Sequence, residues 1–147
     1  MKYEIKDRPD FGVIQVLFEQ PGEQMLVESS AMVARDTAMT METNMQGGLL
    51  AAAKRKLLTG ESIFQNTFTA TAAGQTLWIA PGPEGDAQVL EMDGAHEMLL
   101  NSGAFLAAAP SVTIDSKWGG AKSFFSGTSF FLIKASGHGP LFFNAYG

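Results

Sequence analysis

An internal repeat constrains this chain more than any other feature of its sequence. The segment Glu19–Ala80 is matched, in looser form, by the segment Glu91–Ala145. The clearest stretch aligns Met25–Glu42 with Met98–Asp115 without a gap. A repeat of roughly 70 residues indicates one supersecondary unit used twice, with the apolar face of each copy completed by its neighbour.

The composition predicts a single folded domain that contains both copies. The chain has 147 residues, of which 46% are hydrophobic and 17% are charged. This length and apolar content are sufficient for a real core. We therefore expect one domain over residues 1–147, built of two repeats at about 11–81 and 83–146.

Several function classes are disfavoured by what the sequence lacks. It has no cysteine, which excludes disulfides, thiolate catalysis and cysteine-ligated metals. It also lacks the P-loop, the nucleophile elbow and the H-E-x-x-H motif. We therefore expect no enzymatic activity, no cofactor and no metal. The net charge of −5 makes nucleic acid an improbable partner. With no apolar leader and no run of ~20 apolar residues, a cytoplasmic location is expected.

The element pattern predicts an all-β fold. Residues 11–19 and 23–28 are apolar runs joined by a hairpin-like turn, and residues 62–70 and 75–80 form a second such pair around Gly74. A further strand is expected at 39–42 from its two-residue alternation. The second repeat offers strands at 88–92, 98–100, 105–108, 112–115, 129–135 and 141–145. One short helix is expected at 48–58, and a sharp turn at Pro81-Gly82-Pro83 separates the repeats.

The histidines and methionines are interpreted as structural. His96 and His138 lie in turn-like segments without a Ser, Asp or His partner at a catalytic or metal-ligating spacing, so both are expected to be exposed. Met32, Met39 and Met41 align with Phe105, Val112 and Ile114. Those positions therefore require apolar volume and not sulfur, and we expect the methionines to fill the core.

One cluster of basic residues, Lys54-Arg55-Lys56, has two interpretations. Flanked by leucines on a short amphipathic helix, it can contact an anionic membrane surface or a protein partner. Alternatively it is the solvated face of a helix whose leucines cap the core. Peripheral membrane contact is therefore one of the hypotheses for this chain.

Asn66 is a polar residue where the second repeat has Ile133. The period of two places it on the same face as Phe64 and Phe68, so we expect it to be buried and hydrogen-bonded to backbone near a strand end. The alternative is a small-ligand pocket between the repeats, near Asn66 and Trp78.

Three motifs resemble a known family. They are Gly60–Ala70 followed by Leu77–Pro81, then Gly103–Pro110, and then Lys117–Gly127. They resemble the altered-inheritance-of-mitochondria, mitochondrial-biogenesis family, which is widespread in prokaryotes. The resemblance implies an all-β, pseudo-symmetric domain, similar to the tryptophan RNA-binding attenuation protein, with no established catalytic activity. It also implies a further repeat-length segment after residue 147, so either two units suffice through self-association or the third lies outside this sequence.

The resulting prediction is two similar β-units, in a sandwich- or prism-like arrangement about a pseudo-symmetry axis, with one short helix. The favoured function is a non-enzymatic binding or scaffolding module, followed by small-ligand binding and then by RNA binding. Self-association is expected through an interface that includes Phe142, Phe143 or Tyr146, because these aromatic residues end the sequence with nothing after them to cover them.

Overall fold

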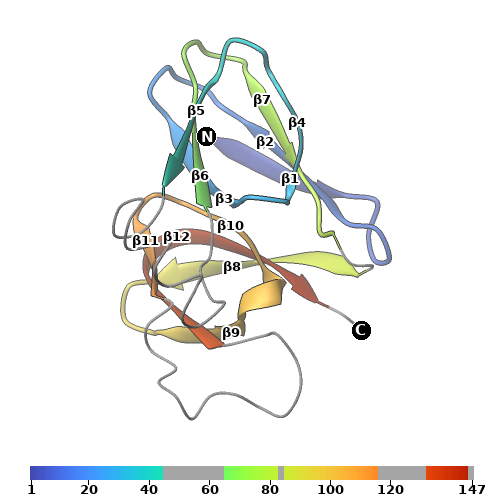
Figure 1. The fold of residues 1–147 in the computed structure, drawn as a ribbon, viewed down its shortest axis with the longest axis vertical. Coiled ribbons are helices and arrows are strands. Elements are labelled where there is room, and N and C mark those ends of the chain that lie inside the picture. The colour runs from blue at the N-terminus through green and yellow to red at the C-terminus, as the bar shows by residue number, and fades with distance from the viewer. Residues whose placement is uncertain (45–64, 83–84, 116–131, 146–147) are drawn as a thin grey trace, which may run out of the picture.

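The structure is a computed structural model, and it describes residues 1–44, 65–82, 85–115 and 132–145. The fold is all-β, as predicted, and the described ranges contain twelve strands and one short 3₁₀ helix at Ser102–Ala104 (Figure 1). In chain order the strands are β1 (Lys2–Lys6), β2 (Val13–Leu17), β3 (Gln24–Glu28), β4 (Met32–Arg35), β5 (Thr40–Asn44), β6 (Gln65–Thr69), β7 (Thr76–Ile79), β8 (Asp86–Asp93), β9 (Met98–Asn101), β10 (Phe105–Ala108), β11 (Val112–Asp115) and β12 (Leu132–Ala145). The helix expected at 48–58 lies outside the described residues.

The strands form two antiparallel sheets. One has four strands in the order β1-β2-β7-β4. The other has eight, with the path β11-β12-β10-β3-β6-β5, and both β8 and β9 also pair with β12. The long strand β12 therefore organises the second half, because its first part pairs with β9 and β11 and its second part with β8 and β10.

Strand pairing follows the same scheme in the two halves. In the first half, β6 pairs with β3 and β5, and β7 pairs with β2 and β4. In the second half, the two parts of β12 take the places of β6 and β7. The registers also correspond: Met25 lies opposite Phe68, and its aligned residue Met98 lies opposite Ala135. A register irregularity at residues 32–34 of β4 recurs at residues 105–107 of β10.

Two clusters of buried apolar residues form the core. The first includes Ile14, Val16, Val27 and Phe142, all fully buried, and the second includes Phe105, Ile133 and Leu141. Burial of apolar side chains of this size stabilises the fold by roughly 1.5–3 kcal/mol each.

The hairpins expected from the sequence are not formed. β2 pairs with β1 and β7, whereas β3 pairs with β6 and β10, so the chain changes sheet at the turn after Phe18. Likewise β6 and β7 belong to different sheets. The crossing has a physical reason: Val16 of β2 and Val27 of β3 enter the same core cluster from two different sheets.

Methionine positions agree with the core interpretation only in part. Met39 is buried, as is its aligned residue Val112, and Met32 is half-buried against the first cluster. Met41 is 45% exposed, so the expectation that it fills the core is wrong. It lies on β5, the last of the described strands at one end of the eight-stranded sheet.

The N-terminal strand β1, which the sequence did not predict, connects the two halves. The Tyr3 ring packs edge-on against Phe142, with centroids 4.9 Å apart and planes at 90°. Its hydroxyl donates a hydrogen bond to the carboxylate of Glu91 on β8. Burial, followed by this hydrogen bond to a carboxylate, raises the pKa of Tyr3 to about 12.

Candidate functional site

Two open sheet edges carry exposed apolar side chains. Within the described ranges, β4 pairs only with β7, and β9 pairs only with β12. Val33 on β4 is 62% exposed, and Leu99 on β9 is 46% exposed. The two strands lie far apart in Figure 1, with β4 in the upper half and β9 at the bottom. Unpaired strand edges are templates for pairing with another chain, and the apolar side chains increase that tendency.

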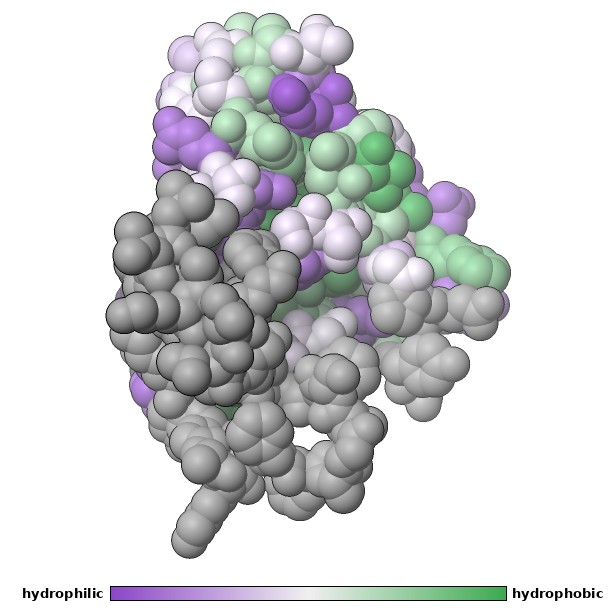
Figure 2. Space-filling view, viewed as in Figure 1, coloured by the Kyte–Doolittle hydropathy of each residue, from purple (hydrophilic) through white to green (hydrophobic). Residues whose placement is uncertain are grey.

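The exposed apolar residues belong to a mixed surface. Figure 2 shows hydrophobic residues among polar ones over the upper half of the molecule. Single exposed apolar side chains are common in proteins, so exposure alone does not identify a site. Val33 and Leu99 are candidates because each lies on a strand that has one edge unpaired by any other described strand.

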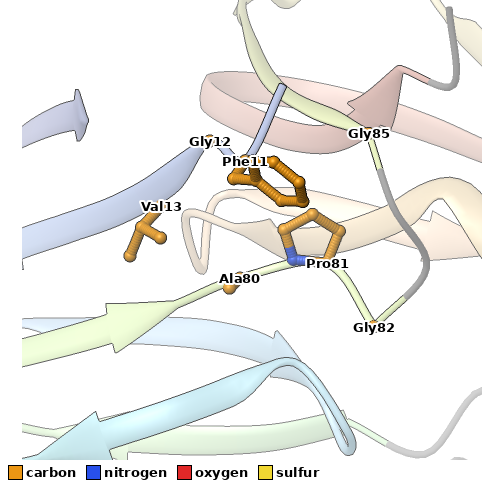
Figure 3. Close-up of a pocket in the computed structure, with 7 residues that line it drawn as sticks. All are labelled: Phe11, Gly12, Val13, Ala80, Pro81, Gly82 and Gly85. Carbon is orange, nitrogen blue, oxygen red and sulfur yellow. The ribbon is translucent and has the colours of Figure 1, made fainter. Parts of the chain in front are cut away.

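A pocket of about 320 Å³ lies where the first half of the chain passes into the second. It is lined by Phe11 and Gly12, which precede β2, by Val13 at the start of β2, and by Ala80, Pro81, Gly82 and Gly85 from the segment between β7 and β8. Phe11 is 68% exposed, and its ring faces that of Pro81 (Figure 3). The lining is suited to an apolar group.

An ion pair fixes the wall of this junction pocket. The Arg8 guanidinium donates to the Asp86 carboxylate through Nε, at 3.0 Å, and through Nη2, at 2.8 Å. Gln88 Nε2 donates to the same carboxylate at 2.7 Å. Both of the Arg8 bonds go to Asp86 Oδ2, and Nε is also 3.3 Å from Oδ1. This charge-assisted contact holds the loop before Phe11 against the start of β8.

Asn66 and Trp78 are not brought together. Asn66 is on β6 of the large sheet, and Trp78 is on β7 of the four-stranded sheet. Neither lines the junction pocket. Trp78 is half-buried, with the Lys6 Nζ 5.3 Å from its ring centroid, which is cation–π geometry.

Asn66 is buried, as expected, with 9% exposure, near the start of its strand. Its Oδ1 accepts a hydrogen bond from Thr43 Oγ1 at 2.9 Å, so this partner is a side chain and not the expected backbone group. The hydrogen bond crosses between paired strands, because Asn66 lies opposite Thr43 in the β5–β6 ladder.

We predict that Asn66→Ala lowers the free energy of unfolding by roughly 1–3 kcal/mol, because it removes the partner of a cross-strand hydrogen bond at a buried position. Chemical denaturation monitored by circular dichroism measures the change. Thr43→Ala removes the same hydrogen bond at its exposed partner, so it should lower the free energy of unfolding by less than Asn66→Ala does. An unchanged denaturation midpoint for Asn66→Ala would contradict the structural role.

Phe142 and Phe143 do not form the exposed patch predicted from the sequence. Phe142 is fully buried in the first core cluster, and Phe143 is half-buried against the second. Because its ring is fully buried, Phe142 offers no surface to another copy in this structure, and the expected self-association stays a prediction. Tyr146 lies outside the described residues, as do Lys54, Arg55 and Lys56.

Both histidines are exposed, as expected. His96 lies in the turn after β8, where its Nδ1 is 2.6 Å from Asp93 Oδ2. The backbone N–H of His96, its side chain and the backbone N–H of Ala95 together lower the pKa of Asp93 to about 2. No group of three or more His, Asp or Glu side chains suited to a metal ion occurs among the residues that the structure describes.

Sequence reasoning missed Val33, Leu99 and Phe11. The repeat itself contained a signal for the first two, because Val33 aligns with Leu106 and Leu99 with Leu26. In the structure, one member of each aligned pair is more covered than the other: Leu106 is buried and Leu26 is half-buried, whereas Val33 and Leu99 are exposed. The sequence does not reveal that difference, since it depends on which strands meet.

Comparison with known proteins identifies the family. The family model described as mitochondrial biogenesis AIM24 matches residues 3–147. The crystal structure of protein SPYM3_0169 from Streptococcus pyogenes is similar, with a TM-score of 0.70 and 26% sequence identity. That alignment covers 99% of this chain and 65% of that one, so this chain spans about two thirds of its length. No curated protein matches the chain.

The part of the chain described by the structure contains no helix long and apolar enough to cross a membrane. The family match extends over nearly the whole sequence, and the similar crystal structure comes from a protein whose fold is shared along almost all of this chain. The chain therefore belongs to the AIM24 family of mitochondrial biogenesis proteins.

Proposed function

We propose that the chain is a non-enzymatic binding module that builds protein assemblies by strand addition at open sheet edges. The observation that carries the proposal is the exposure of Val33 on β4 and Leu99 on β9, each on a strand that is paired on one side only within the described ranges. An extended segment that adds to such an edge gains main-chain hydrogen bonds and covers the exposed side chain.

Strand addition at these edges is favoured by burial of the exposed apolar side chains. Full burial of a valine or leucine side chain contributes roughly 1.5–3 kcal/mol, and the main-chain hydrogen bonds add to it.

Synthetic peptides test the edges as strand acceptors. A peptide of residues 30–37, which contains the β4 sequence, is titrated into the full chain with binding followed by NMR chemical shifts. We expect saturable shifts confined to β9 and its neighbours, and binding at least about tenfold weaker in Leu99→Lys, where a charge replaces the apolar contact.

A scrambled peptide of the same composition and the variant Met41→Lys are the controls. Met41 is 45% exposed on β5, so this variant adds the same charge to another edge strand. Shifts that are absent, or that are equal for the scrambled peptide, would refute strand addition at this edge.

The junction pocket supports a second candidate function, the binding of a small apolar ligand. Its volume of about 320 Å³ and the exposed Phe11 ring are the supporting observations. Fluorescence of 1-anilinonaphthalene-8-sulfonate should rise saturably on binding and lose that response in Phe11→Ala. Leu17→Ala, at a 38% exposed apolar residue on β2, is the matched control. An identical response in the two variants would eliminate the pocket as the binding site.

A further inference from the structure

The contact between the two halves is itself a strand pairing. β3 of the first half pairs antiparallel with β10 of the second, with Leu26 opposite Ala108 and Val27 opposite Ala107. Side chains of both strands are buried at this contact: Val27 and Ala107 are fully buried, and Leu106 is 3% exposed. This pairing joins the halves into one continuous sheet.

Each half contains a counterpart of both strands in that contact. The ungapped alignment maps β3 onto β9 and β10 onto β4. The pairing scheme gives the same correspondence. β3 pairs with β6, and β9 pairs with the first part of β12, which corresponds to β6. Likewise β4 pairs with β7, and β10 pairs with the second part of β12, which corresponds to β7. The contact between the halves uses β3 and β10, so among the described strands β9 and β4 each keep one unpaired edge.

Residues of the open strands are more exposed than their aligned residues in the two strands of the contact. Leu106 of β10 is 3% exposed, whereas its aligned residue Val33 of β4 is 62% exposed. Leu26 of β3 is half-buried, whereas its aligned residue Leu99 of β9 is 46% exposed. The aligned strands β5 and β11 give no such contrast in pairing, because β5 ends the eight-stranded path in the first half and β11 ends it in the second.

We propose that β9 of one copy of this chain pairs antiparallel with β4 of a second copy and so repeats the β3–β10 contact between copies. Transfer of the internal register places Leu99 opposite Arg35 and Leu100 opposite Ala34. This inference rests on the proposed strand addition and names the partner as another copy of the chain. β4 of that copy would pair with β9 in the register in which β10 pairs with β3.

Arg35 is compatible with this pairing. Its counterpart Ala108 is fully buried, but the Arg35 guanidinium is held within its own half, where Nη1 donates to the carbonyl oxygens of Met39, at 2.6 Å, and Asp36, at 3.2 Å. The charged group is therefore already hydrogen-bonded, and the aliphatic stem is available to pack against Leu99.

The contact is heterologous, because it joins two different surfaces. Each copy carries one β4 edge and one β9 edge, and the two lie at opposite ends of the view in Figure 1. Contacts of this type form closed rings or open chains and not a simple two-fold dimer. This property provides a sharp test.

Two variants each block one edge, Val33→Lys on β4 and Leu99→Lys on β9. Both residues are exposed, so the variants should fold, which circular dichroism and thermal melts check. Analytical ultracentrifugation of the full chain, from micromolar to submillimolar concentration, measures assembly. We expect the unmodified chain to associate and each variant alone to associate at least about 100-fold more weakly, because a lysine replaces a buried apolar contact.

An equimolar mixture of the two variants should form a dimer with one copy of each, because the intact β9 of one pairs with the intact β4 of the other and no edge remains to extend the chain. Met41→Lys, on β5, should assemble like the unmodified chain. The corresponding aspartate variants at positions 33 and 99 repeat the test with the opposite charge.

Three results would overturn the inference: a monomeric unmodified chain, assembly that neither variant weakens, or a dimer of Leu99→Lys alone. If the β4 peptide binds the β9 edge and the full chain is nevertheless monomeric, strand addition stands and the choice of a second copy fails. If neither occurs, the proposed function fails with it.

Discussion

Replacement of Phe142 by alanine should lower the free energy of unfolding by about 3–5 kcal/mol. The ring is fully buried in the first core cluster, and its removal leaves a cavity between β12 and the N-terminal strand, where Tyr3 packs edge-on against it at 4.9 Å. Urea denaturation followed by circular dichroism measures the loss as a shift of the midpoint.

Phe11→Ala is the matched control for this change. It removes the same ring from a position that is 68% exposed, so its effect on stability should stay within about 0.5 kcal/mol. A small loss for Phe142→Ala, together with altered self-association, would restore the sequence-based view of this residue as a contact between copies.

Gly137→Ala should be the second large perturbation. Gly137 has φ = +119°, a conformation that L side chains rarely adopt, and an added Cβ would lie 2.1 Å from the carbonyl oxygen of Ser111. The residue lies where β12 leaves its pairing with Val112 and joins β8. Backbone strain and the steric clash each cost about 1–3 kcal/mol, so we expect a combined loss of roughly 3 kcal/mol or more.

Gly74→Ala separates the two costs. Gly74 also has a positive φ, of +85°, but nothing lies within 4 Å of the position of an added Cβ. It should therefore show the conformational cost alone, roughly 1 kcal/mol. Equal losses for the two variants would mean that the close approach of Ser111 to β12 does not constrain the fold.

Local patterns in the sequence predicted where many of the strands lie. The limits expected for residues 105–108 and 112–115 coincide with β10 and β11, because short apolar runs between turn residues are strong local signals. β1 was not expected, since its alternation of charged and apolar residues is too short to distinguish from a loop. β4 was missed although its aligned strand β10 was predicted.

Pairing between strands was not predictable from local patterns. The turns after Phe18 and around Gly74 resemble hairpin turns, yet both carry the chain from one sheet to the other. Which strands meet depends on the packing of both sheets around one core, and this is a property of the whole chain. The same dependence concealed the site, because Val33 and Leu106 are similar residues whose environments differ only through the strand that covers one of them.

Disulfide trapping tests the pairing of β9 with β4 most directly, because the chain contains no cysteine and engineered thiols have no native competitor. Arg35→Cys and Leu99→Cys, made in separate full-length chains and mixed under mild oxidation, are expected to form a mixed disulfide dimer. Directly opposite residues in an antiparallel pair have Cα atoms about 4.5–5.5 Å apart, within the range that a disulfide spans.

The control pairs Arg35→Cys with Asn101→Cys, which is displaced by two residues along β9 and therefore about 7–8 Å away in the predicted register. We expect the first pair to form a mixed dimer faster than either homodimer, and the control mixture to form almost none. Equal cross-linking in both mixtures, or homodimers alone, would contradict the pairing of β9 with β4.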